Sequence, residues 1–80
     1  MRILDNDKDE KLNNIILFLT KAEALRLRDS LNVIIDNPSK HHHSHIPSED
    51  YLKEITVCTY DTEHLDSFDE RSRKLILEDV

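Results

Sequence analysis

Residues 15–37 read IILFLTKAEALRLRDSLNVIIDN, and this stretch predicts a strand, a sharp turn and a helix. Its first five residues, Ile15–Leu19, form the strongest apolar run of the chain. A run that does not alternate with polar residues is typical of a central strand covered on both faces. Thr20 and Glu23 follow with capping-box spacing, in which each side chain accepts a hydrogen bond from the other residue's backbone N–H. We therefore expect a helix that begins after Thr20 and ends just before Pro38, which disfavours helical geometry in the preceding residue.

Apolar residues recur in the predicted helix at steps of three and four, which marks one face for packing against a core. These residues are Ala24, Leu27, Leu31, Ile34 and Ile35. The acidic and basic residues of the helix balance one another, and they form no catalytic signature. We therefore expect this helix to be a core element.

The chain before this stretch gives weaker signals. Met1–Leu4 contains a short strand signal, and Asp5–Lys11 is a polar turn or hairpin tip. Alternating aspartates in that turn are similar to the start of a calcium loop, but Glu10 and Ile16 stand where such a loop needs glycine and a bidentate glutamate. The chain has no glycine, so we expect residues with positive φ to be Asn or Asp, such as Asn6, Asp7, Asn13 or Asn37.

The second half of the chain predicts a hairpin and a second helix. Glu54–Tyr60 is rich in β-branched residues, which favour strands, and Lys40–Pro47 can pair with it across a polar loop. Ser67 and Glu70 have the spacing of a second capping box, which predicts a helix over residues 68–78.

Together these elements predict an α+β fold. We expect a small single-layer, mostly antiparallel sheet of three to four strands with two helices packed on one face, in the order β(β)α-ββα. Eighty residues suffice for one small domain, residues 1–80. A chain of this size buries only about 60% of its unfolded surface, so a partner subunit or a metal is a common source of extra stability.

The cysteine content and the absence of long apolar segments favour a cytoplasmic protein. Cys58 is the only cysteine, which excludes a disulfide within one chain and fits a reducing compartment. Asp5–Lys11 is highly charged where a signal peptide would be apolar. The apolar segments are shorter than the roughly 20 residues that span a bilayer.

The net charge of −6 is concentrated at the end of the chain. Residues 61–80 hold seven acidic residues against three basic ones, a net charge of −4, which leaves −2 for residues 1–60. Nucleic-acid binding requires a basic stripe that this sequence lacks, and anionic membranes are disfavoured for the same reason. The charge is compatible with a basic protein partner, and plain solubility is the simpler explanation.

Four of the five histidines lie in Lys40–Pro47, which reads KHHHSHIP. In an extended segment His41, His43 and His45 share one face, because side chains alternate in direction. Three imidazoles on one face form a candidate site for zinc, nickel or copper. Two alternatives remain open: the histidines are ordinary exposed polar groups, or they form a surface that responds to pH or to a partner.

The sequence lacks a clear catalytic arrangement. Cys58 lies in the middle of a predicted strand, where a cysteine is usually a small packing residue. A nucleophilic cysteine also needs a base and an oxyanion site, and the sequence identifies neither. We therefore expect a protein that is not an enzyme and that needs no cofactor.

Two functions follow from these observations. The first is a small acidic protein-interaction module, acting as a homodimer or as an inhibitor- or immunity-like partner of a basic protein. The second is a transition-metal-binding protein that uses His41, His43 and His45.

Overall fold

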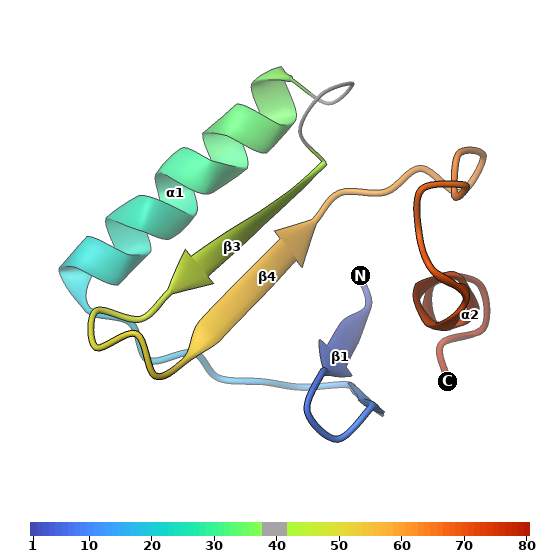
Figure 1. Cartoon of the computed structure of the whole chain (residues 1–80), viewed down its shortest axis with the longest axis horizontal. Helices are drawn as coiled ribbons and strands as arrows, with labels where there is room; N and C mark the ends of the chain where they lie inside the picture. Colours follow the sequence, from blue (N-terminus) through green and yellow to red (C-terminus); the bar gives the residue numbers. More distant parts are fainter. Residues whose placement is uncertain (38–41) are drawn as a thin grey trace. The chain divides into compact units, whose positions relative to one another are not determined.

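The computed structural model describes residues 1–37 and 42–80, and its fold is α+β (Figure 1). The elements within these residues are β1 (Ile3–Asp5), β2 (Glu10–Leu12), α1 (Lys21–Asp36), β3 (His43–Pro47), β4 (Glu54–Cys58) and α2 (Glu70–Glu78). The described strands form two separate antiparallel pairs, β1 with β2 and β3 with β4. The expected single sheet of three to four strands is therefore not confirmed.

The chain divides into two compact units. Unit 1 combines Met1–Leu17 with Asp61–Val80, and unit 2 is the continuous stretch Phe18–Tyr60. Each unit has its own hairpin and its own helix. The single domain expected for residues 1–80 stays a prediction.

The capping box at the start of α1 is confirmed. The Glu23 amide donates to Thr20 Oγ1 over 3.2 Å, and the Thr20 amide donates to Glu23 Oε1 over 2.9 Å. These two bonds satisfy backbone donors that a helix N-terminus leaves without an intrahelical partner. The helix ends at Asp36, with Asn37 as its C-cap, in agreement with the predicted end before Pro38.

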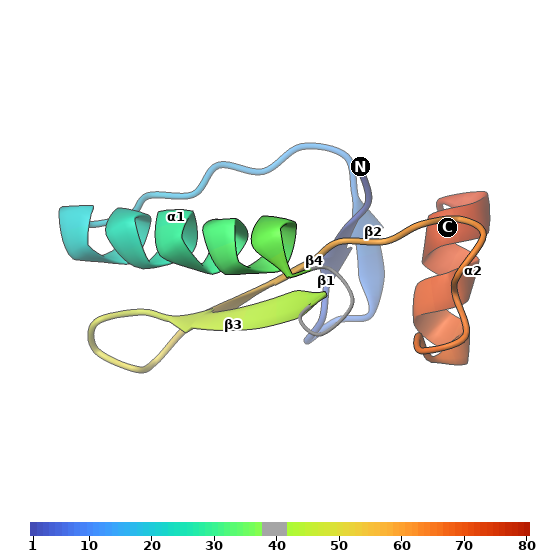
Figure 2. The same ribbon diagram turned by 90° about the horizontal axis from the view of Figure 1, so that it is seen from above.

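Unit 2 consists of α1 and the β3–β4 hairpin, which lie along one another (Figures 1 and 2). The hairpin was predicted, and its side chains alternate between a covered face and an exposed face. The covered face holds Ser44, Ile46, Ile55 and Val57. Ile46 and Ile34 of α1 are the buried residues of this unit. The core of unit 2 is therefore one helix face on one hairpin face.

Two of the five residues of the predicted apolar face of α1 are covered. Ile34 is 1% exposed and Leu27 is half-buried, whereas Leu31 and Ile35 are exposed. Ile34 and Leu27 form one stripe along the helix, and Leu31 and Ile35 form a second stripe beside it. A hairpin of two short strands is too narrow to cover both stripes.

Unit 1 pairs β1 with β2 around a turn at residues 6–9. Asp5 Oδ1 accepts hydrogen bonds from the amides of Asp7 and Lys8, both over 3.1 Å, so this aspartate stabilises the turn. Helix α2 starts at Glu70, close to the predicted start. Its N-cap is Asp69, which accepts from the Ser72 amide, and the predicted Ser67 cap is wrong.

The central strand predicted for Ile15–Leu19 is also wrong. This run belongs to no helix or strand, and Figure 2 draws it as a plain light-blue trace leading to α1. A strand forms only when a neighbour pairs with its backbone, but β1 pairs with β2 and β3 with β4. The sequence shows that the run is apolar, and this property predicted a strand. Within the described residues, however, the backbone of the run pairs with no strand.

Candidate functional site

The first four residues of the apolar run, Ile15–Phe18, are exposed where unit 1 continues into unit 2. The exposed fractions are 44% for Ile15, 76% for Ile16, 49% for Leu17 and 90% for Phe18. Single exposed apolar residues are common on protein surfaces, but a contiguous group marks a contact surface more often than chance. This group is therefore the first candidate for binding another protein.

A second exposed apolar group lies on the loop between β3 and β4, at residues 48–53. Tyr51 is 74% exposed and Leu52 is 80% exposed. The loop is held by local hydrogen bonds: the Ser48 amide donates to the Lys53 carbonyl, the Lys53 amide to Ser48 Oγ, and the Leu52 amide to Asp50 Oδ1. The loop therefore presents two large side chains on an ordered backbone.

This loop was missed as a site by sequence reasoning. Its composition is that of an ordinary polar connection, since Tyr51 and Leu52 are its only large apolar residues. Their exposure depends on the hairpin register, which places them at the tip. The one available signal was the isolated Tyr-Leu pair between acidic residues and a lysine.

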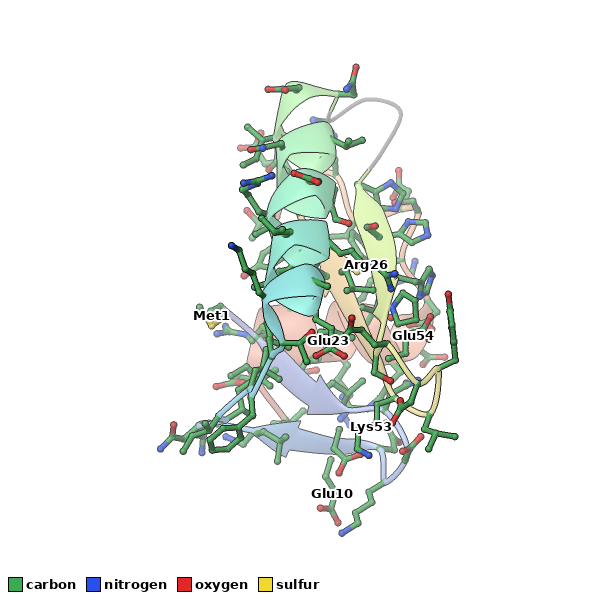
Figure 3. All side chains as sticks on the ribbon, turned by 90° about the vertical axis from the view of Figure 1, so that its left-hand side faces the viewer. Met1, Glu10, Glu23, Arg26, Lys53 and Glu54 are labelled. Atoms are coloured by element: carbon green, nitrogen blue, oxygen red, sulfur yellow. The ribbon has the colours of Figure 1, made fainter. Side chains whose placement is uncertain are left out.

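Glu23 connects the loop to α1. Its Oε1 accepts from the Thr20 amide, and its Oε2 accepts from the Glu49 amide over 2.8 Å. Figure 3 shows Glu23 in the first turn of α1 and Lys53 and Glu54 where β4 begins. Hydrogen bonds from the backbone of Thr20, and then from that of Glu49, lower the pKa of Glu23 below its ordinary value. The side chain therefore stays charged at neutral pH while it joins two elements.

Two further carboxylates of the chain are held in the charged form. A hydrogen bond from the Ser48 hydroxyl, and then one from the Leu52 amide, lower the pKa of Asp50. Hydrogen bonds from the side chain and backbone of Ser72 lower the pKa of Asp69 at the start of α2. Negative charge at these exposed positions persists into mildly acidic solution.

The exposed face of the β3–β4 hairpin carries His43 and His45, as the alternation in the sequence predicted. Their ring centroids are 5.4 Å apart. Cys58 is the pairing partner of His43 across the hairpin, and Thr56 is the partner of His45. The Nδ1 atom of His45 lies 2.9 Å from Thr56 Oγ1 and 3.5 Å from Glu54 Oε1.

The predicted three-histidine set is only partly described. His43 and His45 share a face, whereas His41 lies outside the described residues. Within residues 1–37 and 42–80, no group of three or more His, Cys, Asp or Glu side chains is placed to hold a metal ion. The described part of the chain thus offers a pair of imidazoles on one surface.

Cys58 lies at the end of β4 on the exposed face of the hairpin. Partial burial of its thiol raises the pKa above the ordinary value. A raised pKa reduces the thiolate fraction at neutral pH, and the thiolate is the nucleophilic form. This environment does not favour Cys58 as a nucleophile.

Comparison with protein-family models, with curated proteins and with solved structures gives no match to this chain. No helix among the described residues is both long and apolar enough to cross a membrane.

Proposed function

We propose that this chain is a small acidic protein-interaction module without a catalytic role, acting as a homodimer or as an inhibitor- or immunity-like partner of a basic protein. The observation that carries the proposal is the exposed run Ile15–Phe18, because contiguous apolar surface is the usual mark of a binding region. Tyr51 and Leu52 add apolar surface on the ordered loop, and tyrosine is enriched where interfaces draw most of their affinity.

Charge supports the basic partner. The net charge of −6 attracts a cationic surface, accelerates its approach and disfavours acidic competitors. Hydrogen bonds that lower the pKa values of Asp50 and Asp69 keep these two charges in place as the pH falls.

The test is site-specific photo-crosslinking in the cells that make the protein. A photoreactive residue replaces the 90% exposed Phe18 in one variant and Asn32, an exposed polar residue of α1, in the matched control. We expect a discrete adduct at Phe18, with a second copy or with a basic protein, and none at Asn32. Monomer alone at both positions would contradict the proposal.

Transition-metal binding is the second candidate function, and the shared face of His43 and His45 favours it. Two imidazoles two residues apart on a strand can bind zinc, nickel or copper, with His41 as the third ligand. Thr56 Oγ1 forms a hydrogen bond with Nδ1 of His45. Nε2 is then the nitrogen of this ring that would bind the metal.

Calorimetric titration of untagged protein with each of the three metals tests this second function. We expect submicromolar, one-to-one binding and a raised melting temperature, because a ligand specific for the native state stabilises it. Replacement of His41, His43 and His45 by Ala should abolish both effects. His64→Ala, which removes the fifth histidine, is the matched control and should leave them unchanged. Binding that survives the triple replacement would contradict the metal site.

A further inference from the structure

The surroundings of one imidazole nitrogen, Nδ1 of His45, indicate which nitrogen of that ring carries the proton. Thr56 Oγ1 lies 2.9 Å from Nδ1, and Glu54 Oε1 lies 3.5 Å from the same atom. Thr56 is the pairing partner of His45, and Glu54 stands two residues earlier in β4. Residues two apart on a strand share a face, so the register of the hairpin brings both oxygens to one side of the ring.

The carboxylate decides the direction of these contacts. A hydroxyl can donate or accept a hydrogen bond, whereas a carboxylate only accepts. If Nδ1 had no proton, its lone pair would face the negative oxygen of Glu54, and the two would repel each other. With the proton on Nδ1, the N–H donates to Thr56 and lies beside the carboxylate. The geometry therefore favours the Nδ1–H form of neutral His45, which leaves the lone pair on Nε2.

The ring of His43 is placed to share a metal ion with His45. Their ring centroids are 5.4 Å apart. Zinc–nitrogen bonds of about 2.0–2.1 Å and tetrahedral angles put the centres of two imidazoles on one ion about 5.2 Å apart. Right angles, which copper(II) and nickel(II) favour in square-planar sites, would bring neighbouring rings to about 4.5 Å. The observed separation therefore matches zinc, and an ion in solution can reach the 54% exposed His45 side chain.

We propose that Thr56 and Glu54 are the positioning residues of a zinc site. They hold the Nδ1–H form of His45, which binds zinc through Nε2 together with His43. The inference rests on metal binding, the second proposed function, and it names the metal, the ligand nitrogen and the residues that orient it. Metal-binding histidines commonly donate their other ring N–H to an oxygen acceptor, and loss of that acceptor weakens metal binding about 10- to 100-fold.

Nitrogen NMR of the metal-free, full-length protein tests the tautomer at about pH 8, where imidazole is ordinarily neutral. The chemical shifts of the two ring nitrogens distinguish the Nδ1–H form from the Nε2–H form. We expect wild-type His45 to carry its proton on Nδ1. In the double variant Thr56→Val, Glu54→Gln the proton should move to Nε2, the form that histidine prefers in water. His64, which lies in unit 1, is the reference and should have the same form in both proteins.

Calorimetric titration with zinc tests the positioning role. Thr56→Val, which removes the hydroxyl and keeps the β-branched shape, should lower zinc affinity about tenfold, and so should Glu54→Gln. Thr56→Ser, which keeps the hydroxyl, should retain most of the affinity. A purely structural role would give the opposite order, because valine favours a strand and serine lacks the β-branch. Thr62→Val and Glu63→Gln, at exposed positions of unit 1, are the matched controls and should leave zinc affinity unchanged.

The outcomes separate this inference from metal binding itself. The wild-type spectrum needs no replacement, so it decides the tautomer even if a variant fails to fold. A proton on Nε2 of wild-type His45, or unchanged zinc affinity in both Thr56→Val and Glu54→Gln, overturns the inference. If zinc binding is nevertheless lost when His41, His43 and His45 are replaced by Ala, the metal function stands. If the wild type binds no zinc, the metal function and the inference are both wrong.

Discussion

A single carboxylate, that of Glu23, stabilises both the start of α1 and the loop of the hairpin packed beside it. One oxygen accepts from the Thr20 amide and the other from the Glu49 amide, 26 residues away. The helix cap could be predicted from the spacing of Thr20 and Glu23. The second bond could not, because it depends on where the hairpin loop lies in space.

Glu23 should make the stability of unit 2 depend on pH. Its pKa in the folded chain is below the ordinary value of 4.5, so the folded state binds fewer protons than the unfolded state. The stabilisation is then complete above the unfolded pKa and is lost as pH falls through the folded pKa. Thermal melts of wild type and Glu23→Gln, followed by circular dichroism from about pH 7 to about pH 3, should show the difference in stability shrinking. Glu10→Gln, in unit 1, is the control, and a difference that stays constant with pH would contradict the assignment.

Tyr51 has φ of 60°, an unusual value for a bulky residue. Asn tolerates this conformation, whereas a β-branched residue does not. Tyr51→Asn should therefore leave the free energy of unfolding within about 0.5 kcal/mol of wild type or raise it, and Tyr51→Val should lower it by about 1–2 kcal/mol. Denaturant titration measures both. Leu52→Val, at the exposed neighbour with negative φ, should have little effect, and a similar loss there would refute the conformational explanation.

Positive φ also shows what composition can and cannot predict. In a chain without glycine, Asp9 and Asp79 adopt positive φ, so the predicted residue type is confirmed for these two, whereas the positions predicted as examples are wrong. Tyr51 departs from that preference because the hydrogen bonds of its loop fix the backbone. Residue type predicts a tendency, and the loop geometry decides the position.

At the scale of elements, the apolar residues of α1 that the sequence predicts as one buried face differ in burial. Ile34 is 1% exposed against the hairpin, whereas its neighbour Ile35 is 66% exposed. Ile34→Ala should lower the free energy of unfolding by about 2–5 kcal/mol, through lost burial and the cavity left behind. Ile35→Ala, the matched control, should change it by less than about 0.5 kcal/mol. Comparable losses in denaturant titration would show that Ile35 is also covered in solution.

Local signals predicted the elements better than their pairing. The start of α1, the β3–β4 hairpin and the shared face of His43 and His45 follow from neighbours in sequence. The Ile15–Leu19 strand failed because hydrophobicity predicts burial without naming the strand that supplies it. The Ser67 cap failed because Asp69 competes for the same helix start with a stronger, charged acceptor.

At the scale of the whole molecule, each unit has its own buried residues. Those of unit 1 are Leu65, Leu75 and Ile76, and those of unit 2 are Ile34 and Ile46. Leu75→Ala should therefore destabilise unit 1 by about 2–5 kcal/mol and leave the hydrogen-exchange protection of the α1 amides unchanged. Leu77→Ala, at an exposed position of α2, is the control. Equal loss of protection in α1 would mean that the chain unfolds as one cooperative body.

Unit 1 is held together by contacts between distant parts of the sequence. Arg2 Nε donates to the carbonyls of Leu75 and Ile76 over 3.0 and 3.2 Å. Arg71 Nε lies 2.7 Å from Asp9 Oδ1, and Arg71 Nη1 donates to the Val80 carbonyl over 2.8 Å. Arginine suits this role because its rigid fork of donors reaches two acceptors at once.

This arrangement distributes the entropic cost of folding unevenly between the two units. The contacts of unit 2 lie within the continuous stretch Phe18–Tyr60, whereas Arg2 and Leu75 are 73 residues apart and Asp9 and Arg71 are 62 residues apart. Contacts between residues far apart in sequence form more slowly, because the entropy of closing the intervening loop is lost before the contact is gained. When the whole chain folds, unit 1 should therefore reach its native contacts later than unit 2.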